Sequence, residues 1–406
     1  MQGGAQCASQ RASRCGIARC PLQERKRQRA SALAGPRAAL LCVRITITTK
    51  KPMTRQNLVL AAALCAPALV LAQASPTIYG VVDASVRHTS GLTQAHTPSA
   101  AASTGLASGV NSTSRLGFRA REDLGDGLYA IINLETGLNI DTGGTANANK
   151  FFDRASVVGV GDAWGQVTAG RQTNMLADAI SAVDAVGMRF ASFNPNIATA
   201  ALSAHGLGLE YGAAGSATGS YRLDNSLKYA GKFGPVTARV MYSFGENVGA
   251  GSAQSSVGAG LAYAADGWVV SGAYQRFKTS RELALQAATL GAAYQLGSVR
   301  LVVNTARSEA VTSATATTVQ RVHSAGATWA ATGAVDLTAA VYRLERARTG
   351  LKGDGYTRAI LFAEYKLSRR TRLYAELDRT RWQGGYQGGA AKTGGSGLSG
   401  GVVHTF

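Results

Sequence analysis

The sequence predicts an all-β protein, a transmembrane antiparallel β-barrel of about 16 strands, and three observations support this fold class. From residue 77 onward, segments of about nine to fourteen residues alternate apolar and polar side chains, which is the period of a β-strand. Short turns containing Gly or Asp alternate with longer polar loops. Beyond residue 74, no apolar run reaches the roughly 18 residues that a membrane helix needs.

The first 74 residues differ from the rest of the chain. Residues 1–52 are basic and show no periodic pattern, and we interpret them as a non-native N-terminal extension, with a functional basic leader as the alternative. Residues 53–72 combine a basic start, the apolar run Leu58–Ala72 and small residues at its end, which indicates a secretory signal peptide. Cleavage is expected after Ala72, or else after Ala74. The barrel domain is then 73–406.

The first 74 residues also hold much of the excess positive charge and all of the cysteines. The chain has 42 Lys and Arg against 23 Asp and Glu, but 12 of the basic residues and one acidic residue lie in 1–74. The remainder therefore carries a net charge of about +8 rather than +19, and this basicity does not indicate a nucleic-acid partner. All five cysteines also lie in the first 74 residues. The barrel domain needs no disulfide, and no cofactor is expected.

The stretch 114–140 illustrates the predicted strands. Leu128, Ala130, Ile132, Leu134, Thr136, Leu138 and Ile140 share one face, and Tyr129, Asn133, Glu135 and Asn139 share the other. Before the turn, Leu116, Phe118 and Ala120 oppose Arg115, Arg119 and Arg121. The turn itself, Leu124-Gly125-Asp126-Gly127, contains an Asp-Gly pair that tolerates the positive φ of a tight hairpin. In lipid, the apolar face points outward and the polar face points into a wet lumen.

The other strands follow in order along the chain. Strand one is expected at about 77–89, followed by a loop to about 112, and a long insertion is expected at 174–222. The strands after the hairpin are predicted at 152–160, 166–173, 224–233, 236–246, 255–265, 268–278, 285–296, 299–310, 319–331, 336–348, 356–367, 371–382 and 398–406. An even number of strands closes an antiparallel barrel without an edge, as lipid requires.

Short motifs are spread over the whole of this domain. They are Ile78-Tyr79-Gly80-Val81-Val82-Asp83, Ser114-Arg115-Leu116-Gly117, Glu122-Asp123-Leu124-Gly125-Asp126-Gly127-Leu128, Leu134-Glu135-Thr136-Gly137, Gly170-Arg171-Gln172, Asn225-Ser226-Leu227-Lys228-Tyr229, Leu367-Ser368-Arg369-Arg370-Thr371 and the terminal Val402-Val403-His404-Thr405-Phe406. Together they resemble the general-diffusion porins of Gram-negative bacteria, in the group found in Neisseria and the relatives of Burkholderia. The insertion at 174–222 departs from that group because it lacks a Pro-Glu-Phe-Gly type of sequence.

The resemblance implies a protein of the bacterial outer membrane, surrounded by its lipid. It implies a water-filled channel for passive diffusion of ions and small hydrophilic solutes, usually as a homotrimer, with the third external loop folded into the lumen. The aromatic end at Phe406, with His404, is similar to the signal read by the outer-membrane β-barrel assembly machinery. The positive net charge predicts a mild preference for anions.

Strand parity selects candidate residues for the lumen and its constriction. Arg115 and Arg119 share the polar face of one strand, and Arg154 points inward if Ala155 and Val157 face lipid. Parity also turns three further cations inward, Lys228, Arg239 and Arg300. The resemblance makes Arg115 and Arg154 the first candidates for the constriction. Asp178 and Asp184 in the long loop are the candidate acidic partners.

Arg171 is expected to behave differently from these residues. It shares parity with Val167 and Ala169, so it should point outward near the end of its strand unless a bulge intervenes. A charge against lipid is costly, whereas a charge against a neighbouring subunit is acceptable. We therefore predict a subunit-interface role for Arg171.

Three other functions are alternatives to a general-diffusion channel. A substrate-specific channel would be narrowed by the 174–222 loop. A secreted β-sheet adhesin would lack the aromatic carboxy-terminus and the alternation of short turns and long loops. A barrel enzyme needs a nucleophile and a base in reach of each other. The neighbours His323 and Ser324 lie on opposite faces of one strand, so no catalytic residues are assigned and the chain is not expected to be an enzyme.

Overall fold

The computed structural model describes residues 76–200, 221–245, 252–279, 282–311, 313–348, 351–387 and 392–406. The chain divides into the units Met1–Leu69 and Val70–Phe406, and every described residue belongs to the second. The predicted extension at 1–52 and signal peptide at 53–72 lie outside the described residues.

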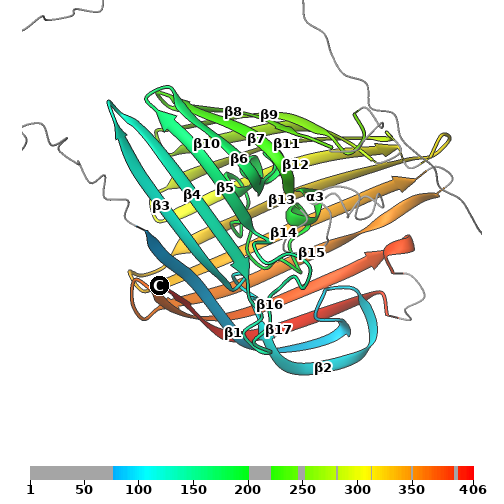
Figure 1. The fold of residues 1–406 in the computed structure, drawn as a ribbon. Helices are drawn as coiled ribbons and strands as arrows, with labels where there is room; N and C mark the ends of the chain where they lie inside the picture. The colour runs from blue at the N-terminus through cyan, green and yellow to red at the C-terminus, as the bar shows by residue number, and fades with distance from the viewer. Residues whose placement is uncertain are drawn as a thin grey trace, which may run out of the picture. The chain divides into compact units, whose positions relative to one another are not determined.

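The described chain forms one antiparallel sheet in which each strand from β3 onward pairs with the next and β17 returns to β1 (Figure 1). The strands are β1 (Thr77–Leu92), β2 (Pro98–Ser108), β3 (Arg115–Gly125), β4 (Leu128–Gly137), β5 (Ala155–Asp162), β6 (Gly165–Thr173), β7 (Arg222–Phe233), β8 (Val236–Ser243), β9 (Ser256–Ala265), β10 (Trp268–Lys278), β11 (Ala284–Leu296), β12 (Val299–Val311), β13 (Thr317–Ala330), β14 (Val335–Arg348), β15 (Leu351–Lys366), β16 (Thr371–Gln383) and β17 (Gly394–Thr405).

These strands fill 16 positions around a closed barrel, because β2 and β3 share one position. The first part of β1 pairs with β3, Val81 opposite Arg115, and the later part pairs with β2, Ala84 opposite Ser108. The chain leaves the ladder between them, at 109–114. The prediction of about 16 strands is therefore confirmed. The loop expected up to 112 contains β2, whose Ser-, Thr- and Ala-rich sequence hides its alternation.

Closure of the barrel depends on both ends of the sheet. β1 and β17 pair from Val81 opposite Thr405 to Ser90 opposite Ser396. Beyond the last ladder pair, Gly80 and Phe406 exchange two backbone hydrogen bonds of 3.1 Å each. The two edge strands thereby satisfy each other's backbone groups, which lipid could not do.

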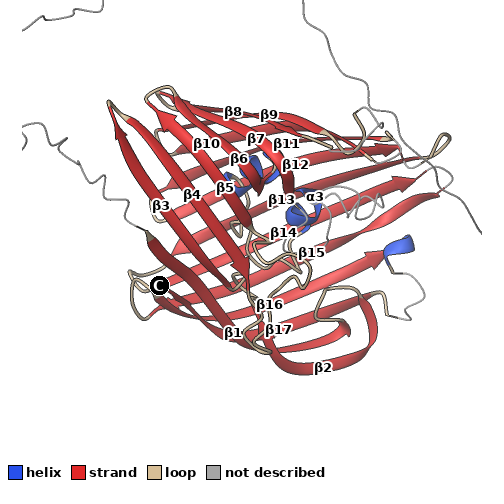
Figure 2. Ribbon diagram, in the orientation of Figure 1, coloured by secondary structure: helices blue, strands red, loops and turns tan. Residues whose placement is uncertain are grey.

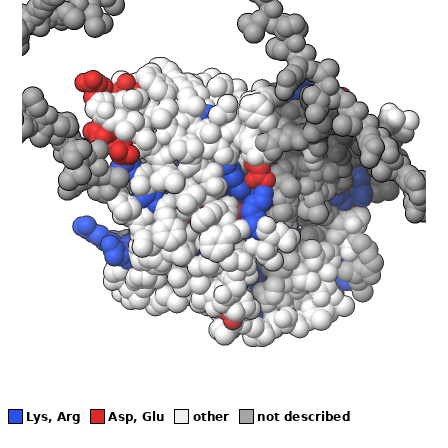
Figure 3. Space-filling view, viewed as in Figure 1, with Lys and Arg blue, Asp and Glu red and all other residues white. Residues whose placement is uncertain are grey.

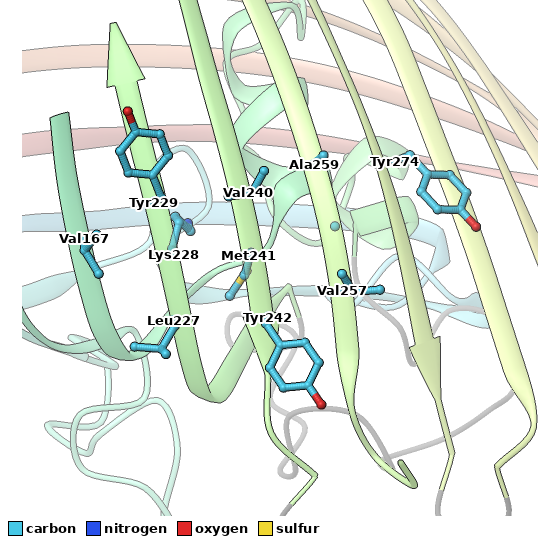
Figure 4. A pocket seen from close by; sticks show the side chains of 11 residues that line it. Val167, Leu227, Lys228, Tyr229, Val240, Met241, Tyr242, Val257, Ala259 and Tyr274 are labelled. Atoms are coloured by element: carbon cyan, nitrogen blue, oxygen red, sulfur yellow. The ribbon is translucent and has the colours of Figure 1, made fainter. Parts of the chain in front are cut away.

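The outer face of the barrel is apolar. Alternate residues are exposed along the strands, and five of them are 52% to 59% exposed: Val158, Val240, Leu290, Val303 and Leu361. Figure 3 shows one face of the protein that is mostly uncharged, with charged side chains gathered in a few places. In Figure 4, Tyr229, Tyr242 and Tyr274 lie along an apolar groove over β6–β10, and this groove belongs to the outward face.

The opposite face of the strands is covered in part by the segment that follows β6. Helix α2 (Met175–Ala182) begins at Asn174, whose side-chain oxygen accepts a hydrogen bond from the Ala177 amide at 2.9 Å, and is followed by α3 (Pro195–Ala200). Both helices are blue in Figure 2. Met175, Leu176 and Ile180 pack among inward residues of β8 to β12. No helix in the described ranges is long and apolar enough to cross a membrane.

The two faces of β12 generate a prediction. Val303 is 56% exposed on the outward face, and Val303→Arg should lower the free energy of unfolding by about 2–4 kcal/mol if this position lies near the bilayer midplane. Urea-dependent folding into lipid vesicles measures the loss. The control Val303→Ala keeps the site apolar and should lower the free energy of unfolding much less. Equal stability of the Arg and Ala variants would contradict an outward position in lipid.

Candidate functional site

A carboxylate on β4 lies at the centre of a cationic cluster. Arg154 Nε donates to Glu135 Oε1 at 2.6 Å, and Arg115 Nε lies 3.6 Å from Glu135 Oε2. The Tyr79 hydroxyl donates to the same carboxylate at 3.0 Å and is 2.8 Å from the side-chain oxygen of Asn133. The two arginines that the sequence selected for the constriction are therefore brought together, with Glu135 between them.

The sequence around Gly117 explains why Tyr79 reaches this carboxylate. Tyr79 pairs with Gly117, and Gly117 in turn pairs with Glu135, across β1, β3 and β4. A Cβ atom at position 117 would stand 2.2 Å from the Tyr79 ring, so only glycine leaves room for the ring to lie across β3. The hydroxyl then projects toward Glu135.

Arg154 lines a hollow on the inner wall, but the parity argument that selected it is wrong. Val158 and Val160 of β5 are the exposed residues, at 59% and 44%, whereas Val157 is buried at 9% on the inward face. Arg154 precedes the first residue of β5, so strand parity does not govern its side chain. Its backbone amide donates to the Glu135 carbonyl at 3.1 Å, and its side chain turns back to the Glu135 carboxylate.

A second ion pair connects β7 to α2. Lys228 Nζ lies 2.8 Å from Asp178 Oδ2 and also donates to the Thr173 hydroxyl at 3.2 Å. The predicted acidic partner Asp178 therefore faces a predicted inward cation, Lys228. Lys228 is 8% exposed in this arrangement.

The two ion pairs border one hollow of about 360 Å³ on the inner face of β4 to β7. Its charged lining residues are Glu135, Arg154, Arg222 and Lys228, and its neutral polar ones include Asn133, Gln166 and Gln172. Arg154 is 7% exposed, and within the described residues its Nη1 atom has no hydrogen-bond partner. With Arg115 beside Glu135, the cations around the hollow outnumber its carboxylates, so this part of the wall has a positive potential.

The other predicted inward cations are spread along the barrel. Arg119 is exposed and its guanidinium lies 5.1 Å from the centre of the Tyr79 ring. Arg239 is partly exposed on β8, on the face opposite the outward Val240. Arg300 donates to the Ala182 carbonyl at 2.7 Å, so it holds the end of α2. None of these three joins the group around Glu135.

Asp184 differs from the expectation of an acidic group facing the passage. It is 0% exposed, and its carboxylate accepts hydrogen bonds from the side chains of Asn194 and Asn196 at 2.8 Å and from the Met188 amide at 2.7 Å. The Tyr342 hydroxyl of β14 donates to it at 3.1 Å. Asp184 therefore organises the loop from inside and fastens it to the wall.

Arg171 lies on the outward face, as parity predicts. Arg171 pairs with Ser156 of β5, which shares a face with the outward Val158. The bulge at this point lies in the pairing of β6 with β7, not in the pairing of β6 with β5. Its side chain is nevertheless 5% exposed, because Nη1 lies 2.7 Å from Asp224 Oδ1 and Nε donates to the Asp153 carbonyl at 2.6 Å. Lys150 also pairs with Asp224. The subunit-interface role remains a prediction.

At the carboxy-terminus, His404 Nδ1 lies 2.9 Å from the Thr371 hydroxyl and Phe406 is 45% exposed. Their predicted role as an insertion signal is not tested by these contacts. In the described part of the chain, no group of three or more His, Cys, Asp or Glu side chains could hold a metal ion.

Sequence reasoning missed several residues of this region. Glu135 was placed on the polar face but was not selected, although the hairpin register puts it diagonally opposite Arg115. Arg222 begins β7 and was assigned to the long insertion. Lys150 and Asp224 come from separate loops and strands, and no local pattern relates them.

The sequence matches the model of a known family, described as Gram-negative porin, over residues 58–385. An outer membrane porin of Bordetella pertussis is 34% identical over 36% of this chain and 40% of its own length. Outer membrane porin protein 32 of Delftia acidovorans is 30% identical over 50% of this chain and 53% of its own length. The chain thus spans only about half of these relatives or less in each alignment.

Solved structures share the fold. An anion-selective porin from Comamonas acidovorans superimposes with a TM-score of 0.68 over 82% of this chain and 100% of its own, at 24% identity. A trimer form of OmpT from Vibrio cholerae superimposes with a TM-score of 0.61 over 82% of this chain and 99% of its own, at 15% identity. The 16-position barrel, the apolar outer face and the family match over 58–385 agree, and the chain belongs to the Gram-negative porin family.

Proposed function

We propose that this outer-membrane protein forms a water-filled channel through which ions and small hydrophilic solutes diffuse passively, with a mild preference for anions. The observation that carries the proposal is the excess of cations around Glu135, where Arg115 and Arg154 share one carboxylate. Arg222 and Lys228 line the same hollow. Fixed charge on a wet inner wall selects among ions without any reaction.

The narrow part of the passage is formed, in this proposal, by the described part of loop 3, residues 174–200, folded into the lumen as the third external loop. Its helix α2 packs against inward residues of β8 to β12, and Arg300 fixes the end of that helix. Asp178 of the loop pairs with Lys228 of the wall. The cationic wall at Glu135 and the loop would together set both radius and potential.

The preference for anions follows from the sign of the charges on the wall. At about 4 Å in water, one unit charge stabilises an opposite ion by about 1 kcal/mol, or roughly fivefold in local concentration. Salt at 0.1 M screens this beyond about 10 Å, so the cations nearest to the passage matter most. The solved relative from Comamonas acidovorans is described as anion-selective, in agreement with this sign.

The proposal involves no catalytic reaction. His323 is exposed and contacts the Thr305 side chain at 3.0 Å, whereas Ser324 lies 3.2 Å from Asn196 on the buried face of the same strand. A histidine and a serine on opposite faces cannot act together as base and nucleophile.

The assembly we propose is a homotrimer surrounded by outer-membrane lipid and inserted by the β-barrel assembly machinery through the strand that ends in Phe406. The cluster of Arg171, Asp224 and Lys150 lies on the outward side among apolar strands. Charges there are unfavourable against lipid and acceptable against another subunit. This supports a contact between subunits at the cluster.

The channel proposal is tested with purified, detergent-extracted protein in planar bilayers. Single-channel conductance should rise in proportion to KCl concentration, because ions cross through water. Conductance that saturates with one solute would instead favour a substrate-specific channel. This alternative is supported by the many contacts that fix loop 3 to the wall. The absence of any channel would contradict both.

The anion preference predicts the effect of removing charge at Glu135. In a KCl gradient, the double variant Arg115→Gln/Arg154→Gln should lower the ratio of anion to cation permeability by at least about fivefold, the effect of losing one nearby charge at about 1 kcal/mol. The control Arg379→Gln removes an exposed charge from the outward face of β16 and should leave the ratio unchanged. Equal ratios in the double variant and the wild type would contradict the assigned wall.

The trimer proposal predicts a weaker assembly when the outward cluster is broken. Arg171→Ala leaves Asp224 with Lys150 alone and should lower the temperature at which trimers dissociate in mild detergent. Semi-native electrophoresis across a temperature series measures this, and the control Arg379→Ala should melt as the wild type does. An unchanged profile for Arg171→Ala would count against the interface.

A further inference from the structure

Arg358 of β15 connects two loops that are far apart in the sequence. Its Nη2 atom donates to the His96 carbonyl at 2.9 Å, in the turn 93–97 that follows β1 and is called here the loop 1 tip. Its Nη1 atom donates to the Phe193 carbonyl and, at 3.4 Å, to the Ser192 carbonyl, both in loop 3. One guanidinium therefore holds the backbone of both loops.

Arg358 is buried, and its hydrogen bonds go to these loop carbonyls rather than to a carboxylate. The residue is 7% exposed, and no carboxylate in the described ranges forms an ion pair with it. Its guanidinium carbon lies 4.3 Å from the Tyr356 ring centre and 5.5 Å from that of Trp382. Arg87 nearby is different, since it pairs with Glu376 at 2.8 Å and with Asp378. A buried cation without a carboxylate is costly unless its donors are used. Here both Nη atoms bond to the two loops, whereas Nε is buried with no hydrogen-bond partner among the described residues.

The loop 1 tip is a compact turn seated on the wall. The Thr93 amide donates to the Thr97 carbonyl at 2.9 Å, and His96 adopts a left-handed conformation with φ of 56°. The His96 ring is buried at 4% exposure, with Nε2 3.1 Å from Asp378 Oδ1 and 3.0 Å from an Arg87 nitrogen. Its seat is therefore formed by β1, β15 and β16.

Loop 3 approaches the same seat from the other side. The Phe193 ring meets His96 edge-on at 5.6 Å and Tyr342 at 5.7 Å, and it is 1% exposed. Phe190 packs on Phe362 at 4.9 Å. The two loops thus touch each other directly, and Arg358 lies beneath the contact.

We propose that Arg358 is a positioning residue that clamps the loop 1 tip and loop 3 together on the wall, so that seating of the loop 1 tip sets the position of loop 3 and the width of the passage. The inference rests on the proposed function, in which loop 3 forms the narrow part. Only the planar fork of arginine presents donors to both loops at once, whereas a lysine in this place reaches one carbonyl at a time.

Electrical recording tests the clamp. Arg358→Met retains contact with the aromatic rings and removes both loop bonds, so it should give several conductance levels and at least twofold more open-channel noise. Arg358→Lys should fall between Arg358→Met and the wild type. The matched control Arg346→Met removes an inward cation of β14 that pairs with Asp354 at 3.1 Å, away from both loops, and it should keep one quiet level. Wild-type noise in a folded Arg358→Met barrel would overturn the proposal.

A distance measurement decides the inference without any current. Residues 75–406 contain no cysteine, so once the five cysteines of residues 1–74 are replaced by serine, spin labels at the exposed positions Ala95→Cys and Ser192→Cys report only the two loops. The distance distribution should be narrow in the wild-type background and at least twice as broad with Arg358→Met. Equal widths would contradict the clamp. If the wild type formed no channel, the proposed function would be wrong, but this measurement would still show whether Arg358 holds the two loops together.

Should Arg358→Met not fold, Arg358→Lys gives the same test, because it keeps the buried charge but reaches one carbonyl at a time. It therefore loses the bond to one of the two loops and should broaden the distance distribution in the same direction. A distribution as narrow as the wild type would then overturn the coupling.

Acid should release the loop 1 tip. Burial lowers the pKa of His96 to about 4, against about 6.5 for a free imidazole. The groups that face it are Asp378 and Glu376 on β16, Arg87 on β1 and Arg358 on β15, and loop 3 presents the uncharged Phe193. The seated tip binds fewer protons than the released tip, so seating is fully favoured above pH 6.5 and weakens as pH falls toward 4. The equilibrium constant for seating falls by up to about 300-fold.

Recording the spin-label distances from pH 7 to pH 4 checks this dependence. The distribution should broaden over that interval in the wild type. His96→Gln has no proton to gain in this range, and it should show little further change between pH 6.5 and pH 4. The same pH response in both proteins would assign the effect to other groups and contradict the role of His96.

Discussion

A backbone amide inside lipid has no water to bond with, and every part of this structure depends on satisfying that requirement. The ladder between β1 and β17, extended by the two bonds between Gly80 and Phe406, removes the only edges that the sheet would otherwise have among the described strands. Closure divides the side chains into two sets by simple alternation. The outward set, such as Val158 and Leu361, can face lipid, and the inward set is free to be polar.

The inward set explains why so many charged side chains are buried yet paired. Glu135 is shared by Arg115 and Arg154, and Lys228 meets Asp178 of the long loop. Such groups are costly to bury alone and acceptable when each has partners of opposite charge or hydrogen-bond donors. The same pairs that hold loop and wall together leave an excess of cations around one hollow. Anchoring and selectivity thus arise from the same residues in the function that we propose.

Much of the fold could be predicted from the sequence because alternation has a period of two and each strand has one apolar face. The hairpin around Asp126, with φ of 53°, follows from that period, and the choice of Arg115 and Arg154 as first candidates follows from the family resemblance. The failures lie where alternation does not apply. β2 has too little contrast between its faces, and Arg154 precedes its strand. The burial of Asp184 depends on Asn194, Asn196 and Tyr342, which only the folded loop brings together.

In the function that we propose, a wet, positively charged wall at Glu135 selects permeating ions by charge. The zero-current potential of the unmodified protein, measured in a planar bilayer with a tenfold KCl gradient, tests this claim most directly. We expect a potential on the anion-selective side that shrinks toward zero as total salt is raised, because salt screens fixed charge. A potential on the cation-selective side, or one unaffected by salt, would contradict it.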